Sequence, residues 1–276
     1  MLNIVSLSLI SVLVGFLGSL TGLGGASILI PIMVLFGVPV KEAIAAGMVS
    51  IIATSSGSAA SYVRDRITNI KIAMYLEMFT ITGAIAGATI TSIIAPQYLY
   101  FFFAAFLLTS FISLRRPAAE SATAQANQDS VSRQLNLRGS YFDKAKKQVI
   151  SYKATNAIWG GLGMVVAGLA AGMLGIGAGA FKVTVQENIL KLPPKVSSTT
   201  SNFIIGMTAL AATSVYLFSG LINLTLVAPI AIGTAIGAVI GGRMLNRLSD
   251  RSLRFLFFAI VIYLIVQMLY KGATSI

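Results

Sequence analysis

Two charged side chains stand inside otherwise apolar segments of this chain, and they point to its chemistry. Lys182 lies within 179–190 and Glu77 lies within 72–94. A charge in a membrane-embedded segment is costly unless it is paired or hydrated, so it marks a functional site by default. Lys182 could attract an anion, or it could form a structural ion pair with Glu187 or reach the membrane surface. Glu77 and Glu187 are candidates for carrying a coupled proton; for Glu77, a polar cap or an arginine partner remains open.

Glycines are concentrated at two points, each before a short apolar segment: Gly22, Gly24 and Gly25, and Gly175, Gly177 and Gly179. These glycines are too dense for a continuous helix. A helix that starts after such a break presents free N–H groups and its positive dipole end, which favour an anion. Close packing between helices is the alternative explanation for glycine in a membrane protein.

Polar side chains in the segments that follow the glycines are further candidates for substrate contact: Ser50, Thr54, Ser201, Asn202 and Thr208. Hydroxyl groups in membrane helices usually bond back to their own backbone, which makes Asn202 the preferred side-chain donor. The chain has no histidine and no cysteine, and it shows no carboxylate pair, nucleophile triad or metal-ligand cluster. We therefore expect no enzyme activity, no metal and no cofactor.

The composition excludes an ordinary soluble domain. Hydrophobic residues make up 56% of the chain, charged residues 10%, and the mean hydropathy is +0.87, whereas about a quarter of a soluble domain is charged. The net charge of +12 comes from basic residues clustered in loops between apolar segments, as membrane topology predicts. We expect membrane lipid rather than nucleic acid as a partner. The N-terminal apolar stretch lacks a basic leader, so we interpret it as a retained helix.

Eight apolar segments are long enough to span a bilayer: 3–21, 43–63, 72–94 and 98–114 in the first half, and 156–174, 197–217, 223–242 and 253–270 in the second. Each half also holds a shorter apolar segment, at 26–37 and 179–190, which is too short to cross the ~30 Å hydrocarbon core without help. The sequence therefore predicts an all-α polytopic membrane protein with Gly-broken helices.

The two halves are copies of one unit. Matching residues lie 153 apart before a one-residue slip and 154 apart after it: Gly15 and Gly168, Gly22 and Gly175, Gly24 and Gly177, then Pro39 and Pro193, Thr54 and Thr208, Gly83 and Gly237. A duplicated, Gly-interrupted hydrophobic unit is typical of a secondary transporter with its site where the halves meet. We predict a first repeat at 1–114, a basic linker at 115–155 and a second repeat at 156–276.

Loop charges predict how the halves face. The loop at 64–71 is basic while its counterpart at 218–222 is uncharged, and the neutral loop at 95–97 corresponds to the arginine-rich 243–254. Basic loops stay in the cytoplasm, so we predict inverted repeats of about five membrane segments each, with 115–155 cytoplasmic. If the short segments only re-enter the membrane, the repeats are parallel instead. Within the linker, 140–153 is either a basic amphipathic helix on anionic lipid or a plain connection.

The glycine clusters carry a family resemblance. Gly18-Ser-Leu-Thr-Gly22-Leu-Gly-Gly-Ala26 resembles the first signature of the sulfite exporter TauE/SafE family, and Gly172-Met-Leu-Gly175-Ile-Gly-Ala-Gly179 resembles its repeated copy. The resemblance implies a permease of the prokaryotic cell membrane for sulfite, sulfonates or related organic acids, commonly an exporter. The chain departs from the family pattern at 181–188, where polar residues including Lys182 replace an apolar run and a proline.

We therefore predict a secondary transporter of a small anion, sulfite or another sulfur-containing anion, that works by alternating access between its two repeats. An anion channel and a non-transporting membrane scaffold or assembly protein are the alternatives. Saturable counterflow would distinguish a carrier from a channel, and a scaffold would bind no ligand. The sequence leaves the direction of transport, the coupling ion and the oligomeric state open.

Overall fold

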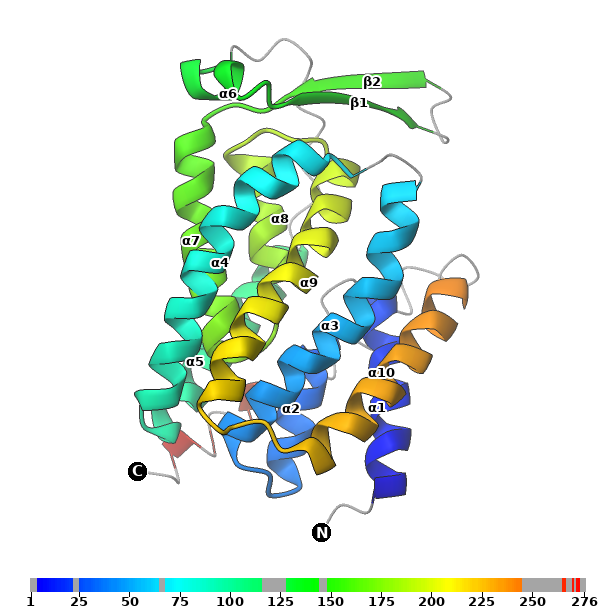
Figure 1. Cartoon of the computed structure of the whole chain (residues 1–276), viewed down its shortest axis with the longest axis vertical. Coiled ribbons are helices and arrows are strands. Elements are labelled where there is room, and N and C mark those ends of the chain that lie inside the picture. The colour runs from blue at the N-terminus through cyan, green and yellow to red at the C-terminus, as the bar shows by residue number, and fades with distance from the viewer. Residues whose placement is uncertain are drawn as a thin grey trace.

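The computed structural model describes residues 4–21, 25–64, 68–115, 128–143, 148–244, 265–266, 270 and 272–273. Its elements (Figure 1) are α1 (Ile4–Thr21), α2 (Ala26–Leu35), α3 (Val40–Arg64), α4 (Ile70–Ile93), α5 (Pro96–Arg115), α6 (Ser130–Gln134), β1 (Arg138–Asp143), β2 (Gln148–Lys153), α7 (Ala157–Leu174), α8 (Gly179–Asn188), α9 (Pro194–Phe218) and α10 (Leu224–Met244). Each apolar segment up to residue 242 forms a helix, as the sequence predicts. The predicted segment 253–270 falls almost entirely outside the described residues.

Three of the described helices, α4, α7 and α9, are long and apolar enough to cross a membrane. The helices start where local chemistry favours it. The Asn69 side chain accepts a hydrogen bond from Ile72 N, 3.2 Å away, and so caps α4. Pro194 occupies the first turn of α9, where its missing N–H costs nothing. The result is a mostly helical fold with three candidate membrane spans among the described residues.

Glycines bring the helix backbones into contact. The most extensive helix pairings join α1 to α10 and α4 to α7. A Cβ atom on Gly83 would lie 2.1 Å from the carbonyl oxygen of Val165, and one on Gly87 would lie 2.2 Å from that of Leu169. Only glycine allows such an approach, because any other residue would collide with the neighbouring backbone.

The two main helix pairs have matching contacts. A Cβ atom on Gly15 would meet the carbonyl oxygen of Thr234, and one on Gly168 would meet that of Thr80. Gly168 is the repeat partner of Gly15, and Thr234 lies 154 residues after Thr80. The same correspondence relates the contacts Gly83–Val165 and Gly237–Val12. The first helix of each half therefore packs against the fourth helix of the other half. In Figure 1, α1 and α10 run in one direction while α4 and α7 run in the opposite one.

Of the two alternatives for 140–153, the amphipathic helix does not form, and the described residues are more ordered than a plain connection. This part of the linker forms an antiparallel hairpin of β1 and β2, in which Tyr141 pairs with Ile150. Aromatic and β-branched residues favour strands, and here they alternate between the two faces: Tyr141 and Tyr152 are buried, whereas Phe142 is exposed. A period of two suits a strand that covers other structure on one side.

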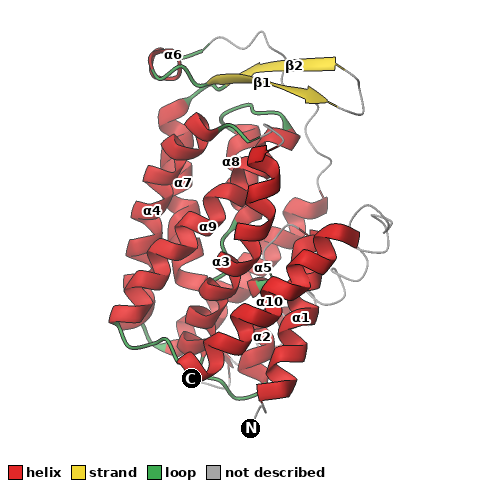
Figure 2. Ribbon diagram, turned by 45° about the vertical axis from the view of Figure 1, so that its right-hand side comes forward, coloured by secondary structure: helices red, strands yellow, loops and turns green. Residues whose placement is uncertain are grey.

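The hairpin lies across the ends of the helices rather than among them (Figure 2). The side-chain amide of Asn69 donates to the carbonyl of Arg138 and to the hydroxyl of Tyr152, both at 3.1 Å. At the other side, Ala154 N donates to the carbonyl of Leu137. The residue that caps α4 thus also fastens the hairpin, so the described part of the linker is a folded element.

Candidate functional site

The second glycine cluster breaks the chain between two helices. α7 ends at Leu174 and α8 begins at Gly179. Gly175, Gly177 and Ala178 have φ values of +69°, +70° and +50°, a left-handed conformation that glycine adopts without penalty. In the first half, α1 ends at Thr21 and α2 begins at Ala26, directly after Gly25. Gly22 and Gly24 lie outside the described residues.

Side chains from two other helices support this break. The last carbonyl groups of a helix lack partners within the helix itself. At the end of α7, the Tyr216 hydroxyl donates to the carbonyl of Gly172, and the Thr91 hydroxyl donates to that of Met173 at 2.9 Å. Because Tyr216 belongs to α9 and Thr91 to α4, these helices hold the interruption in place from both sides.

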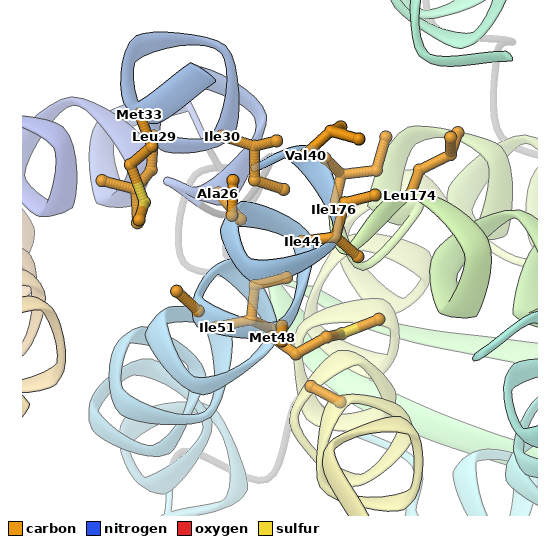
Figure 3. Close-up of a cluster of buried hydrophobic side chains, with 14 of the residues drawn as sticks. Ala26, Leu29, Ile30, Met33, Val40, Ile44, Met48, Ile51, Leu174 and Ile176 are labelled. Atoms are coloured by element: carbon orange, nitrogen blue, oxygen red, sulfur yellow. The ribbon is translucent and has the colours of Figure 1, made fainter. Parts of the chain in front are cut away.

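The immediate surroundings of the break are apolar. Ile30 of α2, Ile44 of α3 and Ile176 of the break gather in one buried cluster (Figure 3). A Cβ atom on Gly175 would lie 2.6 Å from the Ile44 carbonyl oxygen, and one on Gly177 would lie 2.9 Å from the Ile205 side chain. Close packing thus requires both glycines, and a role of their amides in anion binding stays a prediction.

One helical turn beyond the break, a buried polar network joins three helices. Lys182 of α8 is 0% exposed, and its Nζ donates to Thr208 Oγ1 of α9 at 2.8 Å. Thr208 Oγ1 lies 3.2 Å from both carboxylate oxygens of Glu77 of α4, a side chain that is 2% exposed. Thr208 Oγ1 also lies 2.8 Å from the Ile204 carbonyl of its own helix. The threonine hydroxyl therefore lies between an ammonium group, a carboxylate and a backbone carbonyl in the protein interior.

The proposed ion pair between Lys182 and Glu187 does not form in the described structure. Glu187 is five residues from Lys182, about 140° around α8, so the two side chains leave the helix in different directions. The full burial of Lys182 also excludes the alternative in which its amine reaches the surface. The carboxylate that faces its network is Glu77, which comes from the other half of the chain.

The other polar residues predicted as candidates from the sequence lie in different surroundings. The Ser201 hydroxyl donates to the carbonyl of Gly179 at 3.3 Å, which ties α9 to the start of α8. Thr54 donates to the carbonyl of Ser50 on its own helix at 3.1 Å, as expected for a hydroxyl in a membrane helix. Ser50 is fully buried. Asn202 is partly exposed and lies about 100° around α9 from Ser201, so the network does not include it.

Sequence reasoning missed Gln186. Its side chain is 0% exposed, and neither Nε2 nor Oε1 has a hydrogen-bond partner among the described residues. The same holds for the hydroxyl groups of Ser197 and Thr200. The available signal was spacing: Gln186 follows Lys182 by four residues, so both lie on one face of α8.

This arrangement suits the binding of an anion. The opposite charges of Lys182 and Glu77 compensate each other, which limits the free-energy cost of burying either one. An anion that reaches the Lys182 amine competes with Glu77 for the same positive charge. Thr208 stands between them and can donate its single hydroxyl proton to only one acceptor at a time.

Comparison with known proteins identifies the family. The model of the family "Sulfite exporter TauE/SafE" matches residues 7–268. The chain is 23% identical over 282 residues to the "Probable membrane transporter protein YunE" of Bacillus subtilis (strain 168), covering 99% of this chain and all of the relative. It is 27% identical over 248 residues to the "Probable membrane transporter protein YdhB" of the same organism, covering 89% and 90% of the two chains. No solved structure matches it. The chain belongs to the sulfite exporter TauE/SafE family of membrane transporters.

Proposed function

We propose that this protein is a secondary transporter of a small anion, sulfite or another sulfur-containing anion such as an organosulfonate, and that Lys182 provides the charge that binds it. The observation that carries the proposal is the buried Lys182–Thr208–Glu77 network. It brings α4 of the first half together with α8 and α9 of the second half. A transporter of this class is expected to bind its substrate where its halves meet.

Electrostatics favours an anion at this place. The attraction between two charges increases as the dielectric constant around them falls, and Lys182 is completely buried. The Thr208 hydroxyl lies beside the amine and offers a second contact. Backbone N–H groups at the two glycine breaks are further proposed contacts, because a helix start attracts negative charge. The name of the family refers to the export of sulfite.

The arrangement of the helices supports a mechanism of alternating access. The helices α1 and α7 are repeat equivalents and run in opposite directions, and so do α4 and α10 (Figure 1). We interpret the halves as inverted repeats of about five segments each; the last segment of the second half is predicted from the apolar stretch at 253–270, which lies almost entirely outside the described residues. In such transporters one repeat rocks against the other around a fixed site. We propose that the hairpin side faces the cytoplasm of a prokaryotic cell, in agreement with the basic residues at 115–155.

The Lys182→Met variant tests the proposal. Purified protein should lose at least tenfold in affinity for sulfite, about 1.4 kcal/mol, measured by calorimetry. The single variant also leaves the Glu77 carboxylate without its counter-charge, which is destabilising. The double variant Lys182→Met/Glu77→Gln removes both charges and should recover the melting temperature while its sulfite affinity stays low.

Recovery of sulfite binding in that double variant would contradict the proposal, because the anion would then not need the Lys182 charge. Counterflow of labelled sulfite in proteoliposomes distinguishes the alternatives. A carrier shows saturable counterflow that disappears in both variants. A channel conducts sulfite without counterflow, and a scaffold binds no sulfite at all.

A further inference from the structure

Three side chains near the Lys182 network are buried without the hydrogen bonds that buried polar groups normally make. They are Gln186, Ser197 and Thr200; each is fully buried, and their side-chain amide and hydroxyl groups find no partner among the described residues. Most buried polar atoms in native proteins are paired, so such a group calls for an explanation, for example a bound ligand or water. A concentration of three on neighbouring helices indicates a polar site rather than an accident of packing.

Helix geometry places these groups beside Lys182. Gln186 lies one turn after Lys182 on the same face of α8. Ser197 lies one turn before Ser201, whose hydroxyl contacts the Gly179 carbonyl, so this side of α9 meets α8. The connection 189–193 between the two helices is short and folds back onto α8, because Leu192 N donates to the Gln186 carbonyl at 3.0 Å. Gln186 and Ser197 therefore both lie between this connection and the Lys182 network.

We propose that Gln186, Ser197 and Thr200 form a second, uncharged subsite that binds a hydroxyl group of the transported anion, so that the protein prefers short organic anions that carry a hydroxyl over those that lack one. This inference rests on the proposed role of Lys182 as the anion site. A primary amide and two hydroxyls both donate and accept hydrogen bonds, as the hydroxyl of a ligand does. Gln186, Ser197 and Thr200 carry no charge of their own, so they do not balance a second anionic group.

The dimensions agree with a small ligand. Residues one helical turn apart are separated by about 5.4 Å along the axis, and both Lys182 and Gln186 extend from α8 on the same face. The Lys182 amine itself lies at Thr208, so an anion bound there needs its hydroxyl two or three carbons from the charged group to extend toward Gln186. A site built to bond a hydroxyl discriminates strongly against the analogue without it, because its own polar groups then stay unpaired.

A matched pair of probes tests the subsite: ethanesulfonate and 2-hydroxyethanesulfonate, which differ by one hydroxyl. We expect the purified full-length protein to bind the hydroxylated probe at least tenfold more tightly in calorimetry. In Gln186→Met, which keeps the side-chain size, the affinities for the two probes should differ by no more than about twofold. The melting temperature of the empty protein should not fall, because an unpartnered amide is removed from the interior. Thr184→Val is the control, since Thr184 lies about 200° around α8 from Gln186, and its ratio should equal that of the wild type.

Equal binding of the two probes by the wild type would overturn the inference, and so would an unchanged ratio in Gln186→Met. If Gln186→Met does not fold, Ser197→Ala and Thr200→Val give the same readout: a reduced ratio supports the subsite and an unchanged ratio overturns it. Lys182→Met separates this inference from the proposed function. If Lys182→Met no longer binds either probe, and Gln186→Met keeps the wild-type ratio of affinities for the two probes, only the subsite is contradicted. Full retention of both probes in Lys182→Met contradicts the proposed function itself.

Discussion

The Lys182 site in the second half and its counterpart in the first half have the same framework and different chemistry. The repeat counterpart of Lys182 is Leu29 or Ile28, depending on where the one-residue slip falls, and both are buried and apolar. Thr208 corresponds to Thr54. Both hydroxyls bond to a carbonyl group of their own helix, and Thr208 in addition contacts Lys182 and Glu77.

The same contrast extends to the neighbouring positions. Glu77 of α4 corresponds to Ala231 of α10. The unpartnered Ser197 and Thr200 correspond to alanines at 43 and 46, which are completely buried. In contrast, the glycine contacts that join α1 to α10 and α4 to α7 are conserved between the halves down to the atoms involved. The two halves therefore share their backbone packing, while among the described residues the buried charges occur only in the Lys182 network, which takes Glu77 from the first half and Lys182 from the second.

A physical reason favours such asymmetry. Each buried charge carries a desolvation cost that must be offset by a partner. The lysine of the second half finds its counter-charge on a helix of the first half, so one network already connects the two halves. A second lysine at the equivalent place would double that cost and would need its own carboxylate on α10.

The largest expected effect comes from removing the counter-charge. Glu77→Gln leaves Lys182 buried without an opposite charge and should reduce the free energy of unfolding by about 3–5 kcal/mol. Leu29→Met changes the counterpart position with little change in volume and should cost less than about 1.5 kcal/mol. Thermal unfolding in detergent measures both. Saturating sulfite should raise the melting temperature of Glu77→Gln more than that of the wild type, because the anion replaces the missing negative charge. Equal losses in the two variants would show that the halves do not differ as described.

The shared framework is tested by its glycines. Gly15→Ala and Gly168→Ala place a methyl group 2.3 and 2.1 Å from a carbonyl oxygen of the facing helix, so each should lose about 3 kcal/mol, the upper range for overpacking. Gly163→Ala is the control, because its Cβ atom would lie 3.1 Å from movable Val185 side-chain atoms; its loss should stay below about 1 kcal/mol. A large difference between Gly15→Ala and Gly168→Ala in thermal unfolding would contradict the equivalence of the two helix pairs.

The smallest expected effect separates the two threonines. Thr208→Val removes the hydroxyl that bridges Lys182 and Glu77 and should cost about 1–3 kcal/mol, because the buried partners lose a hydrogen bond. Thr54→Val leaves the contacts among Lys182, Thr208 and Glu77 in place, so its sulfite affinity should equal that of the wild type. Sulfite affinity should fall in Thr208→Val. If Thr54→Val lowers sulfite affinity as much, the first half also contributes its threonine to the site.

Much of this protein follows from its sequence because the signals are local. Apolar stretches of membrane length predicted each described long helix, with differences at the ends such as the start of α3 at Val40, where Lys41 and Glu42 interrupt the apolar run. Dense glycines predicted the break before Gly179, because no helix continues through them. Lys182, Glu77 and Thr208 were each recognised as candidates from their type and their apolar surroundings.

The tertiary structure alone decided which of these residues meet. Glu187 is near Lys182 in the sequence, but the two side chains leave α8 in different directions. Glu77 lies near Lys182 because α4 of the first half packs against α9. The strands β1 and β2 pair residues of two separate segments. The burial of Gln186 depends on how α8 packs against its neighbours. Pairings between distant segments depend on packing over the whole molecule, and for that reason spacing along the chain predicts which residues are unusual but not which partner each one finds.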